Sequence, residues 1–169
     1  MGIQNRFNTD SPIWEGTHVV PVIISQSNTA SYTGDAETIA ITGSNITVPK
    51  GKFLPGATFR FTLAGSRTGT AGALTLLITI GSTTVITIAC PSNTATDWLA
   101  QFTVSEHTDF ANQNCTGYFM QPATTYVALD YAAATVDVSQ EVIIQAKATL
   151  ANASDEVYVN YVLVEYWVA

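Results

Sequence analysis

Charge is what this sequence has least of. Of 169 residues only 11% are Asp, Glu, Lys or Arg, less than half of the fraction of about 25% that is usual in soluble domains. Neutral Thr, Ser and Asn side chains take the place of the missing ions. Burying a hydroxyl costs far less free energy than burying an ion, so we expect a surface suited to contact with other subunits. The alternative is an ordinary β-rich domain in which Thr is simply a favourable strand residue.

Bases and long apolar runs are also scarce. Thirteen acids face six bases, which gives a net charge of −7, and only Lys50 and Lys52 lie close together. Nucleic-acid binding depends on clustered Lys and Arg, so we expect no nucleic-acid partner. No window approaches the roughly 18 apolar residues of a membrane span, and the polar first ten residues lack the apolar centre of a signal peptide. We therefore expect no membrane partner.

Cysteine and histidine are almost absent. Cys90 and Cys115 lie 25 positions apart, and neither belongs to a Cys-x-x-Cys pair. A bridge between them remains possible, but we expect two free thiols in a reducing cytosol. His18 and His107 are the only histidines and form neither His-x-x-x-His nor His-Glu-x-x-His. The common zinc motifs are therefore excluded.

Motifs that carry catalysis are missing too. There is no Gly-x-Ser-x-Gly, and the glycine-rich stretch Gly65 to Gly72 precedes a strand pattern, so it lacks the helix N-terminus that would hold phosphate. Four acids could supply oxygen ligands for calcium, but no calcium-loop motif contains them; they are Asp130, Asp137, Glu141 and Glu156. We expect no enzyme activity, no catalytic residues, no cofactor and no metal.

Alternation of apolar and polar residues is what the sequence has in abundance. Thr58 to Leu63 and Leu74 to Ile80 alternate with period two, and glycine or Pro-Gly closes each run. This pattern predicts an all-β, antiparallel jelly-roll sandwich with a short extended N-terminal arm. The expected strands are Thr17–Ser25, Glu37–Thr42, Asn45–Val48, Ala57–Ala64, Leu74–Ile80, Thr83–Ala89, Trp98–Ser105, Gly117–Gln121, Thr124–Tyr131, Gln140–Leu150 and Glu156–Val168.

The breaks between these runs predict the connections. Gly81 and Ser82 are expected to form a two-residue hairpin turn, Gly65 to Gly72 a flexible connection, and 151–155 the turn of a final hairpin between the two longest strands. We therefore expect the chain to have two units: an arm with one docking strand at 1–35, and a jelly-roll domain at 36–169.

The arm is polar, with a few large apolar side chains. We expect Phe7, Ile13 and Trp14 to anchor it on another surface, because an interface usually depends on a few such groups. Docking of the arm's strand onto its own sandwich is equally compatible with the sequence.

Aromatic residues concentrate near the C-terminus. Simple alternation puts Tyr158 on the side of the last strand opposite to Tyr161 and Trp167, so aromatics would line both faces. One set would fill the core, and the other would meet a neighbouring subunit or a sugar. The predicted subunit interface is Tyr158, Tyr161, Tyr166 and Trp167.

Several segments together resemble a known family. They are Phe53-Leu-Pro-Gly56 with the strand to Gly65, the Thr/Gly loop, Leu74 to Gly81, Trp98 after an Asn/Thr loop, and the final pair of strands. In this order they resemble the small jelly-roll domains of tailed-phage virion structural proteins of the head decoration (cement), head-fibre or tail-tip type. The resemblance covers about residues 46–168 and brings no catalytic residues with it.

The resemblance implies a homotrimer. The arm is short and there is no stalk, which favours a capsid cement protein that binds the major capsid protein and stabilises its lattice. Its place would be the capsid exterior of the virion, after assembly in the host cytoplasm. The alternative is a receptor-binding tail-fibre or tail-tip protein that recognises host surface carbohydrate.

Overall fold

The computed structural model describes residues 22–27, 30–33, 38–68, 74–90, 96–106, 110–121, 126–151 and 155–168. All regular structure in these ranges is β-strand, arranged as two antiparallel sheets, so the predicted all-β jelly-roll sandwich is confirmed. None of these ranges contains a helix long and apolar enough to cross a membrane.

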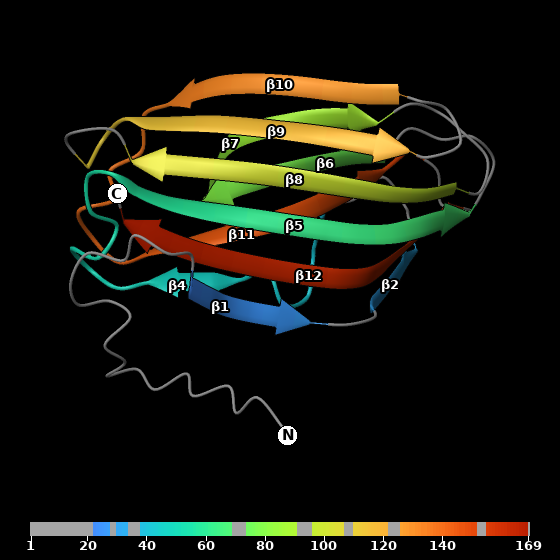
Figure 1. Ribbon diagram of the computed structural model, residues 1–169, viewed down its shortest axis with the longest axis horizontal. Coiled ribbons are helices and arrows are strands. Elements are labelled where there is room, and N and C mark those ends of the chain that lie inside the picture. Colours follow the sequence, from blue (N-terminus) through green and yellow to red (C-terminus); the bar gives the residue numbers. More distant parts are fainter. Residues whose placement is uncertain are drawn as a thin grey trace.

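The larger sheet has seven strands (Figure 1). Its order is β1-β12-β5-β8-β9-β10, and β2 pairs with β12 beyond the end of β1. The bounds are β1 (Val22–Ser27), β2 (Ala30–Thr33), β5 (Ala57–Thr68), β8 (Thr96–Glu106), β9 (Gln113–Gln121), β10 (Tyr126–Ala134) and β12 (Glu156–Val168).

The smaller sheet has five strands and lies behind the larger one in Figure 1. Its order is β3-β11-β6-β7, and β4 also pairs with β11. The bounds are β3 (Thr38–Ala40), β4 (Ile46–Val48), β6 (Leu74–Ile80), β7 (Thr83–Cys90) and β11 (Val142–Leu150).

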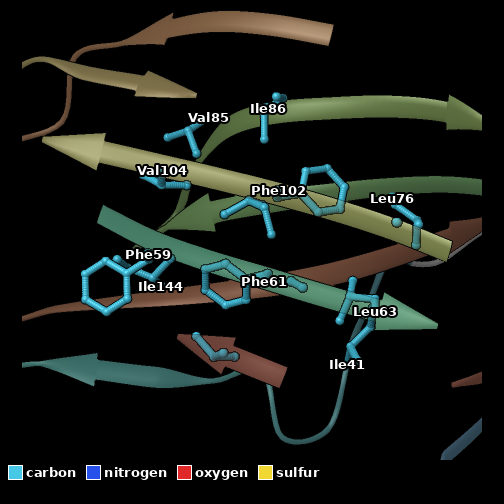
Figure 2. Close-up of a cluster of buried hydrophobic side chains, with 14 of the residues drawn as sticks. Ile41, Phe59, Phe61, Leu63, Leu76, Val85, Ile86, Phe102, Val104 and Ile144 are labelled. Carbon is cyan, nitrogen blue, oxygen red and sulfur yellow. The ribbon is translucent and has the colours of Figure 1, made fainter. Parts of the chain in front are cut away.

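The core lies between the two sheets and follows from alternation. In β5 the side chains of Phe59, Phe61 and Leu63 point inward and are buried, while the positions between them are half-buried on the other side. They pack with Phe102 of the same sheet and with residues of the five-stranded sheet such as Leu76 (Figure 2). Each such side chain contributes about 1.5–3 kcal/mol when it is fully buried.

The expected strand bounds hold best where apolar periodicity is strong. β6 and β12 coincide with their predicted ranges. β5, in contrast, continues to Thr68, so the first residues of the predicted flexible connection are strand. Pairing explains the difference, because Gly65 and Ser66 lie between partners on β12 and β8. β2 was not expected, because its segment reads as polar loop.

The two predicted turns differ in outcome. Gly81 and Ser82 join β6 to β7, Ile80 pairs with Thr83, and Gly81 has a φ of 58°, as a glycine-first hairpin turn requires. The predicted final hairpin is wrong, because β11 lies in the five-stranded sheet and β12 in the seven-stranded sheet. Local pattern marks where a strand ends but not which sheet receives the next strand.

A β-bulge at Asn160 decides which way the aromatic side chains of β12 point. Val159 pairs with Gly65 and Tyr161 with Ala64, so Asn160 is an extra residue on β12. An extra residue shifts the alternation by one. The prediction that Tyr158 and Tyr161 lie on opposite faces is therefore wrong.

The first unit of the chain is described only in part. β1 overlaps the expected docking strand at residues 22–25, continues two residues beyond it to Ser27, and pairs with β12 of the sandwich. The predicted anchors Phe7, Ile13 and Trp14 lie outside the described residues.

Gly65 allows the close approach of β5 and β12 at the bulge. A Cβ atom at this position would overlap the carbonyl oxygen of Tyr158 and lie 2.9 Å from the Trp98 ring. We expect Gly65→Ala to lower the free energy of unfolding by about 3 kcal/mol, measured by urea titration. The three atoms nearest to a Cβ at Gly117 belong to the side chains of Phe102 and Ile88 and not to backbone, so we expect Gly117→Ala to lower the free energy of unfolding by less.

Ser66→Ala, at the next position on the outward side, is the matched control and should change stability by less than about 0.5 kcal/mol. A Gly65→Ala protein with the wild-type urea midpoint would show that β5 and β12 are not this close.

Candidate functional site

The outer face of the seven-stranded sheet is the side turned away from the five-stranded sheet, and it belongs to the larger of the two sheets. Strand register aligns its side chains into rows that run across the sheet. One row is apolar throughout and joins four strands. We call it the apolar row, and it consists of Tyr161, Ala64, Leu99 and Met120.

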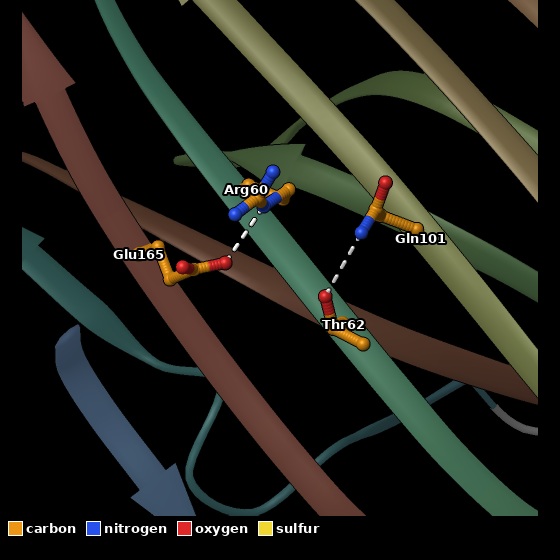
Figure 3. Close-up of polar contacts among 4 residues, drawn as sticks. All are labelled: Arg60, Thr62, Gln101 and Glu165. Carbon is orange, nitrogen blue, oxygen red and sulfur yellow. Dashed lines mark hydrogen bonds and ion pairs between the residues drawn. The ribbon is translucent and has the colours of Figure 1, made fainter. Parts of the chain in front are cut away.

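The next row is mostly polar. Leu163 is followed by Thr62, Gln101 and Tyr118 on the neighbouring strands. The side-chain amide of Gln101 donates to the Thr62 hydroxyl at 3.2 Å, and its carbonyl oxygen points away from Thr62 (Figure 3).

The third row contains the ion pair of this face. Arg60 Nε donates to Glu165 Oε2 at 2.7 Å (Figure 3), and this bond raises the pKa of Arg60. The Arg60 guanidinium also lies 5.3 Å from the centre of the Trp167 ring. Both charges are thus held within the face, and a partly exposed pair of this kind contributes little stability.

A groove of about 470 Å³ opens on the same face between β8, β9 and β10. Its lining residues are Gln101, Thr103, Thr116, Gly117, Tyr118, Asp130 and Tyr131. Tyr131 is 65% exposed, yet its hydroxyl donates to Asn114 Oδ1 at 3.1 Å and its backbone N–H to Asp130 Oδ1 at 2.9 Å. The ring is therefore exposed and restrained at its hydroxyl end by Asn114, and the backbone contact orients the Asp130 carboxylate.

The predicted interface residues divide between surface and core. Tyr158, Tyr161 and Trp167 are half-buried on the outer face. Tyr166 is only 1% exposed, and its ring centre lies 4.9 Å from that of Phe59. The prediction that Tyr166 lies at a subunit interface is therefore wrong, because its alternation phase after the bulge points it inward.

Sequence reasoning missed the other outward residues of this face. Leu99, Gln101, Met120 and Tyr131 sit on predicted strands, but they become a surface only through register between strands. Alternation around the inward Trp98, Ala100 and Phe102 was the available signal, because it assigns Leu99 and Gln101 to the opposite side.

No group of three or more His, Cys, Asp or Glu side chains in the described ranges could hold a metal ion. Asp130, Asp137, Glu141 and Glu156 form no such group. The buried Glu106 has a structural contact instead: it accepts from Gln113 Nε2 at 2.8 Å, and Gln113 also bonds both backbone groups of Val136.

The two cysteines are free and buried. Burial raises the pKa of the Cys90 thiol and of the Cys115 thiol to about 12. Thiolates are the reactive form of cysteine, so neither residue is a nucleophile near neutral pH.

Known structures with distant likeness to this chain include two lectins and a virus. The basic winged bean lectin, in a crystal structure with Tn-antigen, has a TM-score of 0.45 and 7% identity over 88% of this chain and 99% of that one. A lectin from Bauhinia forficata in complex with GalNAc has a TM-score of 0.45 and 9% identity, with the same shares covered. A structure of infectious bursal disease virus, Gx strain, has a TM-score of 0.28 and 12% identity over 89% of this chain and 43% of that one. No protein-family model and no curated protein matches the sequence.

Burial of the thiols makes stability depend on pH. In the unfolded chain a thiol ionises near its ordinary pKa of 9.0, but in the folded protein only near 12. Above pH 9 the unfolded chain loses these protons and the folded protein keeps them, so the free energy of unfolding should fall as pH rises. The expected slope is about 1.4 kcal/mol per pH unit for each thiol, measured by urea titration from pH 8 to about 11.

The Cys90→Ala, Cys115→Ala double variant should show a shallower slope, whatever its absolute stability. Part of the slope should remain, because burial also raises the pKa of Tyr166 to about 12. Equal slopes in both proteins would contradict the prediction.

Proposed function

We propose that this protein is a non-enzymatic bacteriophage virion protein, a capsid cement or decoration protein that binds the major capsid protein on the capsid exterior. The observation that carries the proposal is the apolar row, which crosses four strands of an outer face whose ion pair is satisfied within the face. The resemblance to phage jelly-roll proteins supplies the type of particle.

A second copy of the chain is the partner that we assign to the apolar row, in a homotrimer. The row spans about 14 Å, since neighbouring strands lie about 4.8 Å apart. An interface over the row would remove apolar surface from water and so lower the free energy of the assembly. The side chains concerned are half-buried Tyr161 and Leu99 and the exposed Met120. Closed rotational symmetry would bury the row in every copy.

The polar surroundings of the row favour the same role. Hydroxyls on this face already bond one another: Thr58 with Ser105 at 2.9 Å, and Thr103 with Thr116 at 2.6 Å. A polar group that keeps a partner costs little to bury. The outer face can therefore lie against another protein at low desolvation cost.

Carbohydrate recognition at a tail fibre or tail tip is the second candidate. The observation that favours it is the groove beside Tyr131, which combines an exposed aromatic ring with amide, hydroxyl and carboxylate groups. Polar groups that converge around an aromatic wall are typical of small-molecule sites.

Placing a charge in the apolar row should break the trimer. We expect the wild-type protein to sediment as a trimer at micromolar concentration and Leu99→Lys as a folded monomer near 18.0 kDa. The lysine would be left without water or a partner inside the interface. Thr87→Lys, at an exposed position of β7 in the other sheet, is the control and should remain trimeric. A wild-type monomer, or a trimeric Leu99→Lys protein, would argue against this interface.

Particles without the protein should break at a lower temperature than complete particles. When the ionic strength is lowered, they should also break sooner, at a salt concentration that complete particles still survive. Adsorption to host cells should stay the same. Each added interface ties capsid subunits together against internal pressure. Equal shell stability with lost adsorption would instead favour the receptor-binding function.

A chain lacking residues 1–16 should form a folded trimer that no longer binds capsids, because Phe7, Ile13 and Trp14 are absent.

A further inference from the structure

The groove between β8, β9 and β10 has features that trimer formation does not use. The apolar row crosses β8 at Leu99 and β9 at Met120. Thr103, Thr116 and Tyr131 of the groove lie two rows further along the strands. At about 3.4 Å per residue, the four residues from Leu99 to Thr103 span about 14 Å, so a partner centred on the apolar row leaves room for a small ligand beside Tyr131.

Tyr131 supplies a ready platform for a ring-shaped ligand. The bond from its hydroxyl to Asn114 restrains a side chain that is 65% exposed. An exposed ring that is already ordered loses little conformational entropy when a ligand stacks on it. Its apolar surface is compatible with the C–H groups of a sugar ring.

The groove floor offers both donors and acceptors. The hydroxyl oxygens of Thr103 and Thr116 lie 2.6 Å apart, and only one hydrogen can lie between them, so the other can be donated to a ligand. Gln101 uses one amide hydrogen for Thr62, and its carbonyl oxygen is directed away from that contact (Figure 3). Each sugar hydroxyl is likewise both a donor and an acceptor.

Charge narrows the class of ligand. Among the described residues that line the groove, Asp130 is the one with a charge, and the whole chain carries −7. An anionic ligand would be repelled. A cation would satisfy Asp130 but not the donors of the threonine pair, so a neutral polyhydroxyl ligand fits the lining best.

We propose that this groove is a binding site for a neutral sugar, with one pyranose ring on Tyr131 and its hydroxyls bonded to Gln101, Asp130 and the threonine pair. A volume of about 470 Å³ holds a mono- or disaccharide. The proposal deepens the second candidate function and does not depend on capsid binding.

The test is an NMR titration of the isotope-labelled full chain with the methyl glycosides of galactose, glucose, mannose and N-acetylglucosamine. N-acetylneuraminic acid and choline serve as the anionic and cationic probes. We expect at least one neutral glycoside to shift the backbone amides of Gln101, Thr116, Tyr118 and Tyr131, with a Kd of ~1 mM. Tyr131→Ala should weaken this binding about tenfold, because the stacking surface is lost.

Two variants separate the site from general effects of substitution. Tyr131→Phe keeps the ring but loses the bond to Asn114, so it should weaken binding only about threefold. Tyr158→Ala, on β12 of the same face, should keep the wild-type affinity. Binding that is unchanged in Tyr131→Ala, no response to any neutral glycoside, or stronger binding of either charged probe would overturn the proposal.

The same variants keep the two proposed functions apart. Particles that carry Tyr131→Ala should retain wild-type shell stability if the protein is a cement, whether or not the groove binds sugar. If particles without the protein are less stable, a Tyr131→Ala protein that loses sugar binding and keeps wild-type shell stability would support both the groove and a separate capsid interface.

Discussion

The antiparallel pairing of β5 with β12 is the constraint on which the outer face depends. These strands lie at the centre of the seven-stranded sheet, and their register places every row that crosses it. The bulge at Asn160 shifts that register by one residue, and Gly65 leaves the space into which the backbone at Tyr158 fits. Without the bulge, Tyr161 and Trp167 would not share a side with Tyr158.

Strand periodicity could be predicted from the sequence because it is local. The alternation in Leu74 to Ile80 reports directly which side chains face the core, and β6 matches it residue for residue. Bulges are harder to predict, since a polar residue such as Asn160 in an apolar strand is equally compatible with an outward position in a regular ladder. Whether Tyr166 and Tyr158 point to the same side of β12 depends on that single extra residue. Simple alternation therefore could not distinguish the core aromatic of β12 from the surface ones.

The candidate site could be predicted even less. Its residues come from strands separated along the chain, and only register brings Gln101, Tyr118 and Tyr131 to one groove. Composition did indicate the character of the surface. A sequence with 11% charged residues produced an outer face where threonine and serine hydroxyls bond one another beside the Arg60–Glu165 ion pair.

The positions of the last two strands have a consequence for synthesis in the cell. β11 lies inside the five-stranded sheet and β12 inside the seven-stranded sheet, each with neighbours on both sides. The five-stranded sheet cannot close before β11 has left the ribosome, nor the seven-stranded sheet before β12, although β5, the partner of β12, is translated about a hundred residues earlier. The domain must therefore fold after its translation is complete, and during that wait the apolar sides of β5, β6 and β8 are open to water and to chaperones.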